Sequence, residues 1–164
     1  MTRAIIETLE RQFLQLHERS CSLVSAHSPE VLYRSVPIAG NRPLYSTGDY
    51  LLRSAAAVER TFGGITANLW DDPFEWTLPE NLSTTERILE YLSEVEATRV
   101  RAFARVSDDS DLLKEVLVPN GSTQTLVDLI CGALVEAANY QGRAVTMLSI
   151  ISQSGFPRNQ AWSE

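Results

Sequence analysis

The stretch TLVDLICGALVEAANYQGRAVTMLSII, residues 125–151, decides the fold. Its apolar residues recur at spacings of three and four, which is the period of one face of an α-helix. They are Leu126, Leu129, Ile130, Ala133, Ala137, Tyr140, Ala144, Met147, Leu148 and Ile151. Thr125, with Asp128 three residues later, is typical of a helix start. The stretch therefore predicts one long amphipathic helix.

Composition sets the class of protein. The chain has 164 residues with 44% hydrophobic content, which predicts a single domain over residues 1–164. Its net charge of −7 argues against a nucleic-acid partner, and no apolar run is long enough to cross a membrane. The N-terminus has acidic residues inside its apolar pattern, so it does not resemble a signal peptide. Cys21 and Cys131 lack metal-finger spacing, and we expect buried free thiols in a reducing cytoplasm.

A first helix is predicted over residues 3–26, followed by a short turn through about residue 34. His17 and Cys21 lie four residues apart and so share a helix face that is able to hold a metal ion. Two ligands are few for a metal site. A second apolar face that includes Leu14 and Val24 explains the pair more simply.

A second helix is predicted to begin at Ser46, with Asp49 as its capping partner. The adjacent Gly63 and Gly64 predict a kink, after which the helix resumes through Trp70.

A third helix is predicted from Ser83, with Glu86 completing a capping box. Its solvated side is expected to carry the charged residues Glu94, Glu96, Arg99 and Arg101. The acidic cluster Asp108, Asp109 and Asp111 then predicts a solvated turn, because an EF-hand would need a glycine and a closing glutamate that are not there. The segment LKEVLVPNGSTQ predicts a brief hairpin before the last helix. Together these elements predict an all-α domain, a four-helix bundle with long connections.

Two segments carry a resemblance to a known family. YSTGDYLLRSAAAVE, residues 45–59, resembles the opening of the second helix in DinB/YfiT-like proteins, and ALVEAANYQGRAVTMLSIISQSGFP, residues 133–157, resembles their fourth helix. The segment DDPFEW, residues 71–76, lies between the second and third helices as in that family. The resemblance implies a DinB/YfiT-like bundle, commonly a homodimer, with a three-histidine site for a divalent metal such as zinc or nickel. It also implies a metal-dependent hydrolase or a transferase that adds a small thiol to its substrate.

In this sequence the three ligand positions of the family hold Arg53, Glu136 and Tyr140, and none is a histidine. The family's Arg-Gly-Gln becomes Gln141-Gly142-Arg143. An arginine is a fixed cation that repels a divalent ion, so we expect no bound metal cofactor. Our sharper hypothesis is a salt bridge between Arg53 and Glu136, assisted by the Tyr140 hydroxyl, in place of the metal.

Simpler interpretations stay open for the same positions. Tyr140 is more typical of a core aromatic and Glu136 of a flank residue that reaches water, while Arg53 lies away from the apolar stripe and can point to solvent. Three further residues are candidates to surround this site: Glu59, Asn139 and Arg143. Glu59 could also form a carboxylate pair with Glu136 if their helices face each other.

Two classes of function follow. The first is a non-catalytic DinB-like binding or interaction module, a homodimer that acts through its surface or binds a small molecule. The second is a residual metal-dependent or thiol-dependent hydrolase or transferase of the same superfamily. The sequence contains no glycine-rich phosphate loop and no nucleophile elbow, and its two histidines are too few to favour an ordinary catalytic triad.

Overall fold

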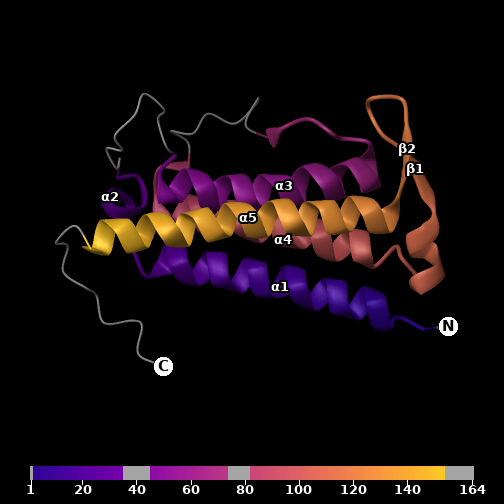
Figure 1. Cartoon of the computed structure of the whole chain (residues 1–164), viewed down its shortest axis with the longest axis horizontal. Helices are drawn as coiled ribbons and strands as arrows, with labels where there is room; N and C mark the ends of the chain where they lie inside the picture. The colour runs from indigo at the N-terminus through magenta and orange to yellow at the C-terminus, as the bar shows by residue number, and fades with distance from the viewer. Residues whose placement is uncertain (1, 35–44, 74–81, 154–164) are drawn as a thin grey trace.

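The chain is built mainly of helices, as predicted. The computed structural model describes residues 2–34, 45–73 and 82–153. Four long helices lie side by side: α1 (Ala4–Ser25), α3 (Thr47–Ala67), α4 (Thr85–Phe103) and α5 (Leu126–Gln153) (Figure 1). The shorter elements are α2 (Pro29–Leu32), the 3-10 helix η3 (Asp109–Leu113), and the strands β1 (Glu115–Leu117) and β2 (Thr123–Thr125). The all-α class is therefore confirmed.

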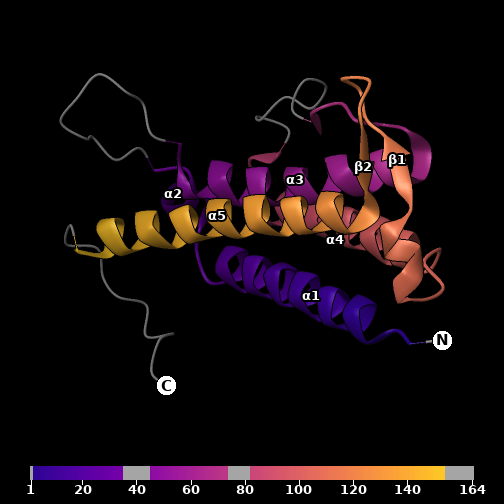
Figure 2. The same cartoon turned by 45° about the vertical axis from the view of Figure 1, so that its right-hand side comes forward.

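The helix α3 is central to the packing. It lies against α5 on one side and α4 on the other, and α1 covers α4 and the adjacent part of α5 (Figure 2). The rings of Phe13, Phe62 and Phe103 meet between α1, α3 and α4, with centroids 5.2–6.1 Å apart. All three are almost fully buried. Cutting any one of them back to alanine is expected to cost about 3–5 kcal/mol.

Two of the predicted capping residues are confirmed, and the third is replaced by the residue that follows it. The Asp49 amide donates to Ser46 Oγ over 3.1 Å, and the Ser46 amide donates to Asp49 Oδ2 over 3.0 Å, which completes the capping box of α3. The Asp128 amide likewise donates to Thr125 Oγ1 at the start of α5. The helix α4 is capped by Thr84 instead of Ser83, because the Arg87 amide donates to the Thr84 hydroxyl over 3.3 Å. Neighbouring hydroxyl residues offer the same acceptor, so the sequence alone does not choose between them.

The paired glycines do not break the helix, and its predicted continuation through Trp70 is wrong. The helix α3 continues through Gly63 and Gly64 to Ala67, where Asn68 ends it with a left-handed φ of 57°. Trp70 folds back onto the helix instead of extending it. A Cβ at Gly64 would lie 2.3 Å from the Trp70 ring, so glycine is required there by this close approach.

The acidic turn has a structural role that the prediction of a solvated turn overlooked. The Asp109 carboxylate accepts hydrogen bonds from the Ile5 and Ile6 amides at 3.2 and 3.1 Å, and so caps the first turn of α1 from a distant part of the chain. Asp108 and Asp111 form the capping box of η3. A hydrogen bond from the Ser110 side chain lowers the pKa of Asp108, and a hydrogen bond from Lys114 lowers the pKa of Asp111.

The predicted hairpin is confirmed. β1 and β2 pair antiparallel with Val116 opposite Gln124. Gly121 has a φ of 82°, and its amide donates to the Val118 carbonyl, which closes the turn.

Arg99 is buried, which corrects its predicted place on the solvated side of the third helix. It is 5% exposed and donates to both oxygens of Glu96, from Nε at 2.8 Å and from Nη2 at 2.5 Å. Its guanidinium also lies 5.6 Å from the centre of the Phe103 ring. Val95 and Phe103 are buried one turn before and one turn after Arg99, so Arg99 belongs to the core face of α4.

Candidate functional site

Glu136 forms an ion pair across the seam between α3 and α5. Its Oε2 accepts a hydrogen bond from Arg60 Nη2 over 2.7 Å, and the two side chains are 40% and 36% exposed. The partner is Arg60 and not Arg53, so the predicted Arg53–Glu136 bridge is wrong. The interpretation of Glu136 as a flank residue that reaches water is only partly right, because its side chain is partly exposed but is also bonded to Arg60.

Helix geometry explains why Arg60 takes the place predicted for Arg53. The two arginines lie seven residues apart, which returns a helix to nearly the same face with a drift of about 20°. Both therefore border the same seam, two turns apart. Arg53 lies at the level of the tyrosines near the start of α3, with its guanidinium 3.9 Å from the centre of the Tyr45 ring.

Tyr140 belongs to a row of tyrosines at the edge of the core. It is half-buried, and its ring lies 6.4 Å from that of Tyr50, which in turn lies 5.7 Å from that of Tyr45. On its other side, the Arg143 guanidinium lies 5.6 Å from the Tyr140 ring centre. This supports the interpretation of Tyr140 as a packed aromatic side chain. Its position also leaves part of the ring facing the outer surface of α5.

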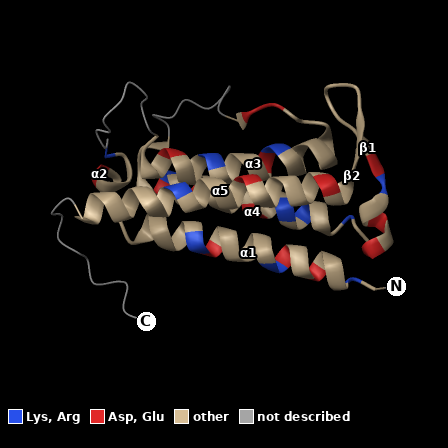
Figure 3. Cartoon of the chain, viewed as in Figure 1, with Lys and Arg blue, Asp and Glu red and all other residues tan. Residues whose placement is uncertain are grey.

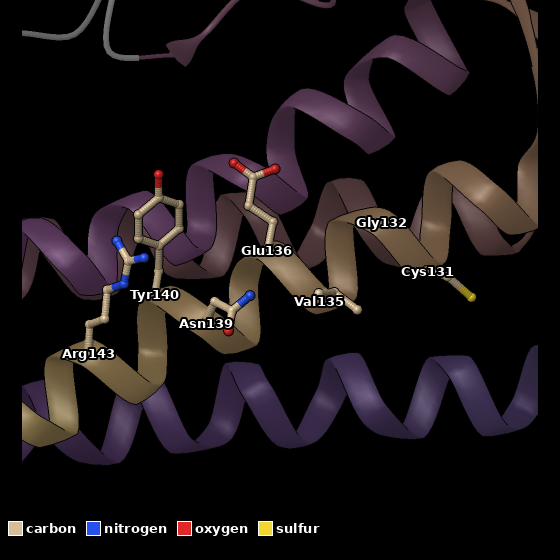
Figure 4. Close-up of a pocket in the computed structure, with 7 residues that line it drawn as sticks. All are labelled: Cys131, Gly132, Val135, Glu136, Asn139, Tyr140 and Arg143. Carbon is tan, nitrogen blue, oxygen red and sulfur yellow. The ribbon is translucent and has the colours of Figure 1, made fainter.

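A hollow of about 500 Å³ runs along that outer surface, between Cys131 and Arg143. Glu136 and Tyr140 line it, together with two of the three residues predicted to surround them, Asn139 and Arg143. In Figure 4 the Glu136 and Tyr140 side chains reach toward α3, and the Arg143 guanidinium lies beside the Tyr140 ring. Gly132 and Val135 line the same hollow and were not among the predicted site residues. Their spacing of three, with Asn139 four further on, is the signal that places all three on one helix face.

Glu59 lies elsewhere. It accepts a hydrogen bond of 2.6 Å from the Tyr91 hydroxyl and borders a separate groove of about 880 Å³ between α3 and α4. Burial, with the nearby Glu59 carboxylate, raises the pKa of Tyr91. Glu59 and Glu136 therefore have different partners and do not form a carboxylate pair.

Arg53, Glu136 and Tyr140, the three residues expected at metal-ligand positions from the resemblance, do not fit a divalent metal ion. Glu136 is the one carboxylate among them, and it is already bonded to a guanidinium. Arg53 would add a second positive charge, and a tyrosine is a poor ligand unless it is ionised. Within residues 2–34, 45–73 and 82–153, no cluster of three or more His, Cys, Asp or Glu side chains is arranged to hold a metal.

The two thiols are less buried than predicted. Cys131 is exposed in the hollow, whereas burial was expected, because it falls on the outer face of α5 with Gly132. Cys21 is half-buried, with its Sγ 3.6 Å from His17 Nε2. Burial, with the Glu96 and Glu18 charges, raises the pKa of Cys21, which disfavours the reactive thiolate. The second apolar face proposed for α1 holds for buried Val24, while Leu14 is 39% exposed.

Gln141 joins α5 to α1. It is 2% exposed, and its side-chain amide donates to the Leu16 carbonyl and to Ser20 Oγ, both over 2.8 Å. A buried amide with two partners fixes the axial position and rotation of α5 against α1. Gln141 and Arg143 thus face opposite ways, one into the bundle and the other into the hollow.

Comparison with known proteins adds no relative. No protein-family model, curated protein or solved structure matches this chain. In the described part of the chain, no helix has the length and apolar content that a membrane span requires.

Proposed function

We propose that this protein is a non-catalytic member of the DinB/YfiT-like proteins that binds a small molecule in the hollow on α5. The observation that carries the proposal is the ion pair between Glu136 and Arg60, at a position where the family has a metal ligand. An arginine that pairs with the carboxylate weakens the electrostatic reason for a cation to bind there. The resemblance to the family rests on the sequence segments alone.

The hollow has features of a ligand site. Its lining is mostly apolar, with the polar side chains of Glu136, Asn139 and Arg143 along it. A mainly apolar surface with a few polar groups that fix orientation is typical of small-molecule sites. Gly132 lines one end, where a larger side chain would have room because a Cβ there would meet no atom within 4 Å.

The enzymatic alternative has less support. Metal-dependent chemistry would need a donor set that Arg53, Glu136 and Tyr140 do not supply. Thiol-dependent chemistry would need an activated thiolate, and the pKa of Cys21 is shifted the wrong way for that role.

The proposal is tested by titrating ¹⁵N-labelled protein with a set of small aromatic compounds that are neutral, anionic or cationic. We expect amide shifts at Gly132, Val135, Asn139 and Arg143. Replacing Gly132 by leucine fills the hollow and should abolish the shifts. Gly142→Leu is the matched control, because Gly142 is also exposed on α5 and a Cβ there would meet no atom within 4 Å, but it does not line the hollow.

Two outcomes would contradict the proposal. One is an absence of shifts along α5 with every compound in the set. The other is stoichiometric binding of Zn²⁺ or Ni²⁺ that perturbs Glu136 and Tyr140. The homodimer that the resemblance implies also stays a prediction, and light scattering coupled to size-exclusion chromatography measures it directly.

A further inference from the structure

The polarity of the residues that line the hollow changes along α5. Gly132, Val135, Asn139 and Arg143 follow one another at spacings of three, four and four, so they form one continuous stripe. The Gly132 end is apolar, and Val135 is 61% exposed there. The Arg143 end is polar. With a rise of 1.5 Å per residue, Val135 and Arg143 are about 12 Å apart along the helix.

The charge of the hollow comes from Arg143. Along α5, the other charged residues are Asp128 near its start and Glu136 (Figure 3). Arg60 balances the Glu136 carboxylate from outside the hollow. Within the described residues, Arg143 has no carboxylate at ion-pairing distance. The hollow therefore has one uncompensated positive charge, although the whole chain is acidic.

Arg143 is also held in place. Its guanidinium lies over the Tyr140 ring, and a cation–π contact of this kind restricts a long side chain without using all its hydrogen-bond donors. Asn139 lies one turn earlier on the same face and adds an amide donor. The guanidinium is a charged fork of donors that suits a carboxylate, and the Asn139 amide is a second donor on the same stripe.

We infer that the hollow binds an amphipathic monocarboxylate, whose carboxylate bonds to Arg143 and Asn139 and whose apolar body lies along Val135 toward Gly132. This inference rests on the proposed function, and it adds the charge and polarity of the ligand. A single carboxylate matches the single free charge. An apolar body covers the exposed Val135 side chain and removes its surface from water.

A charge series with one body tests the inference. The probes are 4-phenylbutyrate, the neutral 4-phenylbutan-1-ol and the cationic 4-phenylbutylamine, each titrated into ¹⁵N-labelled full-length protein. We expect 4-phenylbutyrate to bind with a Kd on the order of 1 mM, as suits a small ligand in an open site. The alcohol should bind several-fold more weakly, and the amine should cause no shifts in the hollow.

Variants separate the contribution of charge to binding in the hollow from the contribution of its shape. Arg143→Gln should weaken 4-phenylbutyrate binding about tenfold and leave the alcohol unchanged. Arg11→Gln is the matched control, because Arg11 is an exposed arginine on α1 away from the hollow, and it should change neither affinity. Arg60→Gln, which leaves Glu136 unbalanced, should weaken the acid although Arg60 does not line the hollow.

The inference is overturned if the amine binds as tightly as the acid, or if Arg143→Gln leaves the affinity for the acid unchanged. If the alcohol shifts the α5 amides and the acid does no better, the inference fails while the proposed function stands. If no probe of any charge shifts these amides, both fail.

Discussion

Replacing Arg99 by methionine is expected to destabilise the protein severely, although the sequence places Arg99 on a solvated face. Arg99 is 5% exposed in the structure, and its guanidinium donates two hydrogen bonds to Glu96. Methionine fills much of the same volume without the charge, so it leaves the Glu96 carboxylate without its partner. That carboxylate belongs to a side chain only 18% exposed, which limits the water that can replace the guanidinium.

The magnitude follows from the burial of both partners. Breaking a fully buried ion pair costs about 3–5 kcal/mol, and exposed pairs contribute about 0.2–1 kcal/mol. Glu96 keeps some access to water, so we expect a loss of about 2–3 kcal/mol in the free energy of unfolding. For a chain of this size, each kcal/mol lowers Tm by roughly 2–4 °C.

Urea unfolding followed by circular dichroism measures the loss. Arg101→Met is the matched control, because Arg101 is exposed on the same helix, and it should change stability by no more than about 0.5 kcal/mol. The double variant Glu96→Leu with Arg99→Met removes both charges and should regain most of the loss. The reasoning is refuted if Arg99→Met costs no more than Arg101→Met, or if the double variant is less stable than the single one.

Two further predictions concern the ends of the helices and the response to alkali. Asp109→Ala removes the cap of α1 and should lower the free energy of unfolding in urea by about 1 kcal/mol. Asp109→Asn should lower it less, because asparagine also caps helices. Equal stability of the two variants and the unmodified protein would contradict the assignment of Asp109 as the cap. Burial, with the nearby Asp49 charge, raises the pKa of Tyr33 to about 12, and its hydroxyl donates to the Leu82 carbonyl. Because this folded-state pKa lies above the unfolded value of about 10, the stabilisation is complete below pH 10 and is lost as the pH rises toward 12. The free energy of unfolding should therefore fall over that interval, and it should fall less steeply in Tyr33→Phe; identical slopes would show that Tyr33 titrates normally.

The helices could be predicted from the sequence because their signals are local. The period of α5, the Ser46–Asp49 capping box and the Pro-Asn-Gly turn each depend on residues within a few positions of one another. The predicted continuation of α3 through Trp70 is wrong because the end of the helix depends on a contact that is not local. Gly64 accommodates Trp70, whose return onto the helix is a tertiary contact that no local pattern encodes.

The site was only partly predictable. Glu136, Tyr140, Asn139 and Arg143 share the hollow because all of them lie on α5, where helical spacing is enough to place them. Contacts between side chains on different helices depend on the axial register of those helices, which local sequence patterns do not determine. Arg53 and Arg60 occupy nearly the same face of α3, and only the axial position of α5 decides which of them meets Glu136. The capping of α1 by Asp109 could not be predicted for the same reason, because it joins residues about a hundred positions apart.

The most direct measurement is a crystal structure of the protein grown with ZnCl₂, with an anomalous difference map recorded at the zinc edge. We propose that the Arg60–Glu136 ion pair lies where DinB/YfiT-like proteins have a metal ligand, between α3 and α5. This proposal predicts that Arg60 Nη2 stays within hydrogen-bond distance of Glu136 Oε2 and that no zinc peak lies beside them. A zinc ion about 2 Å from a Glu136 oxygen, with Arg60 displaced, would contradict it.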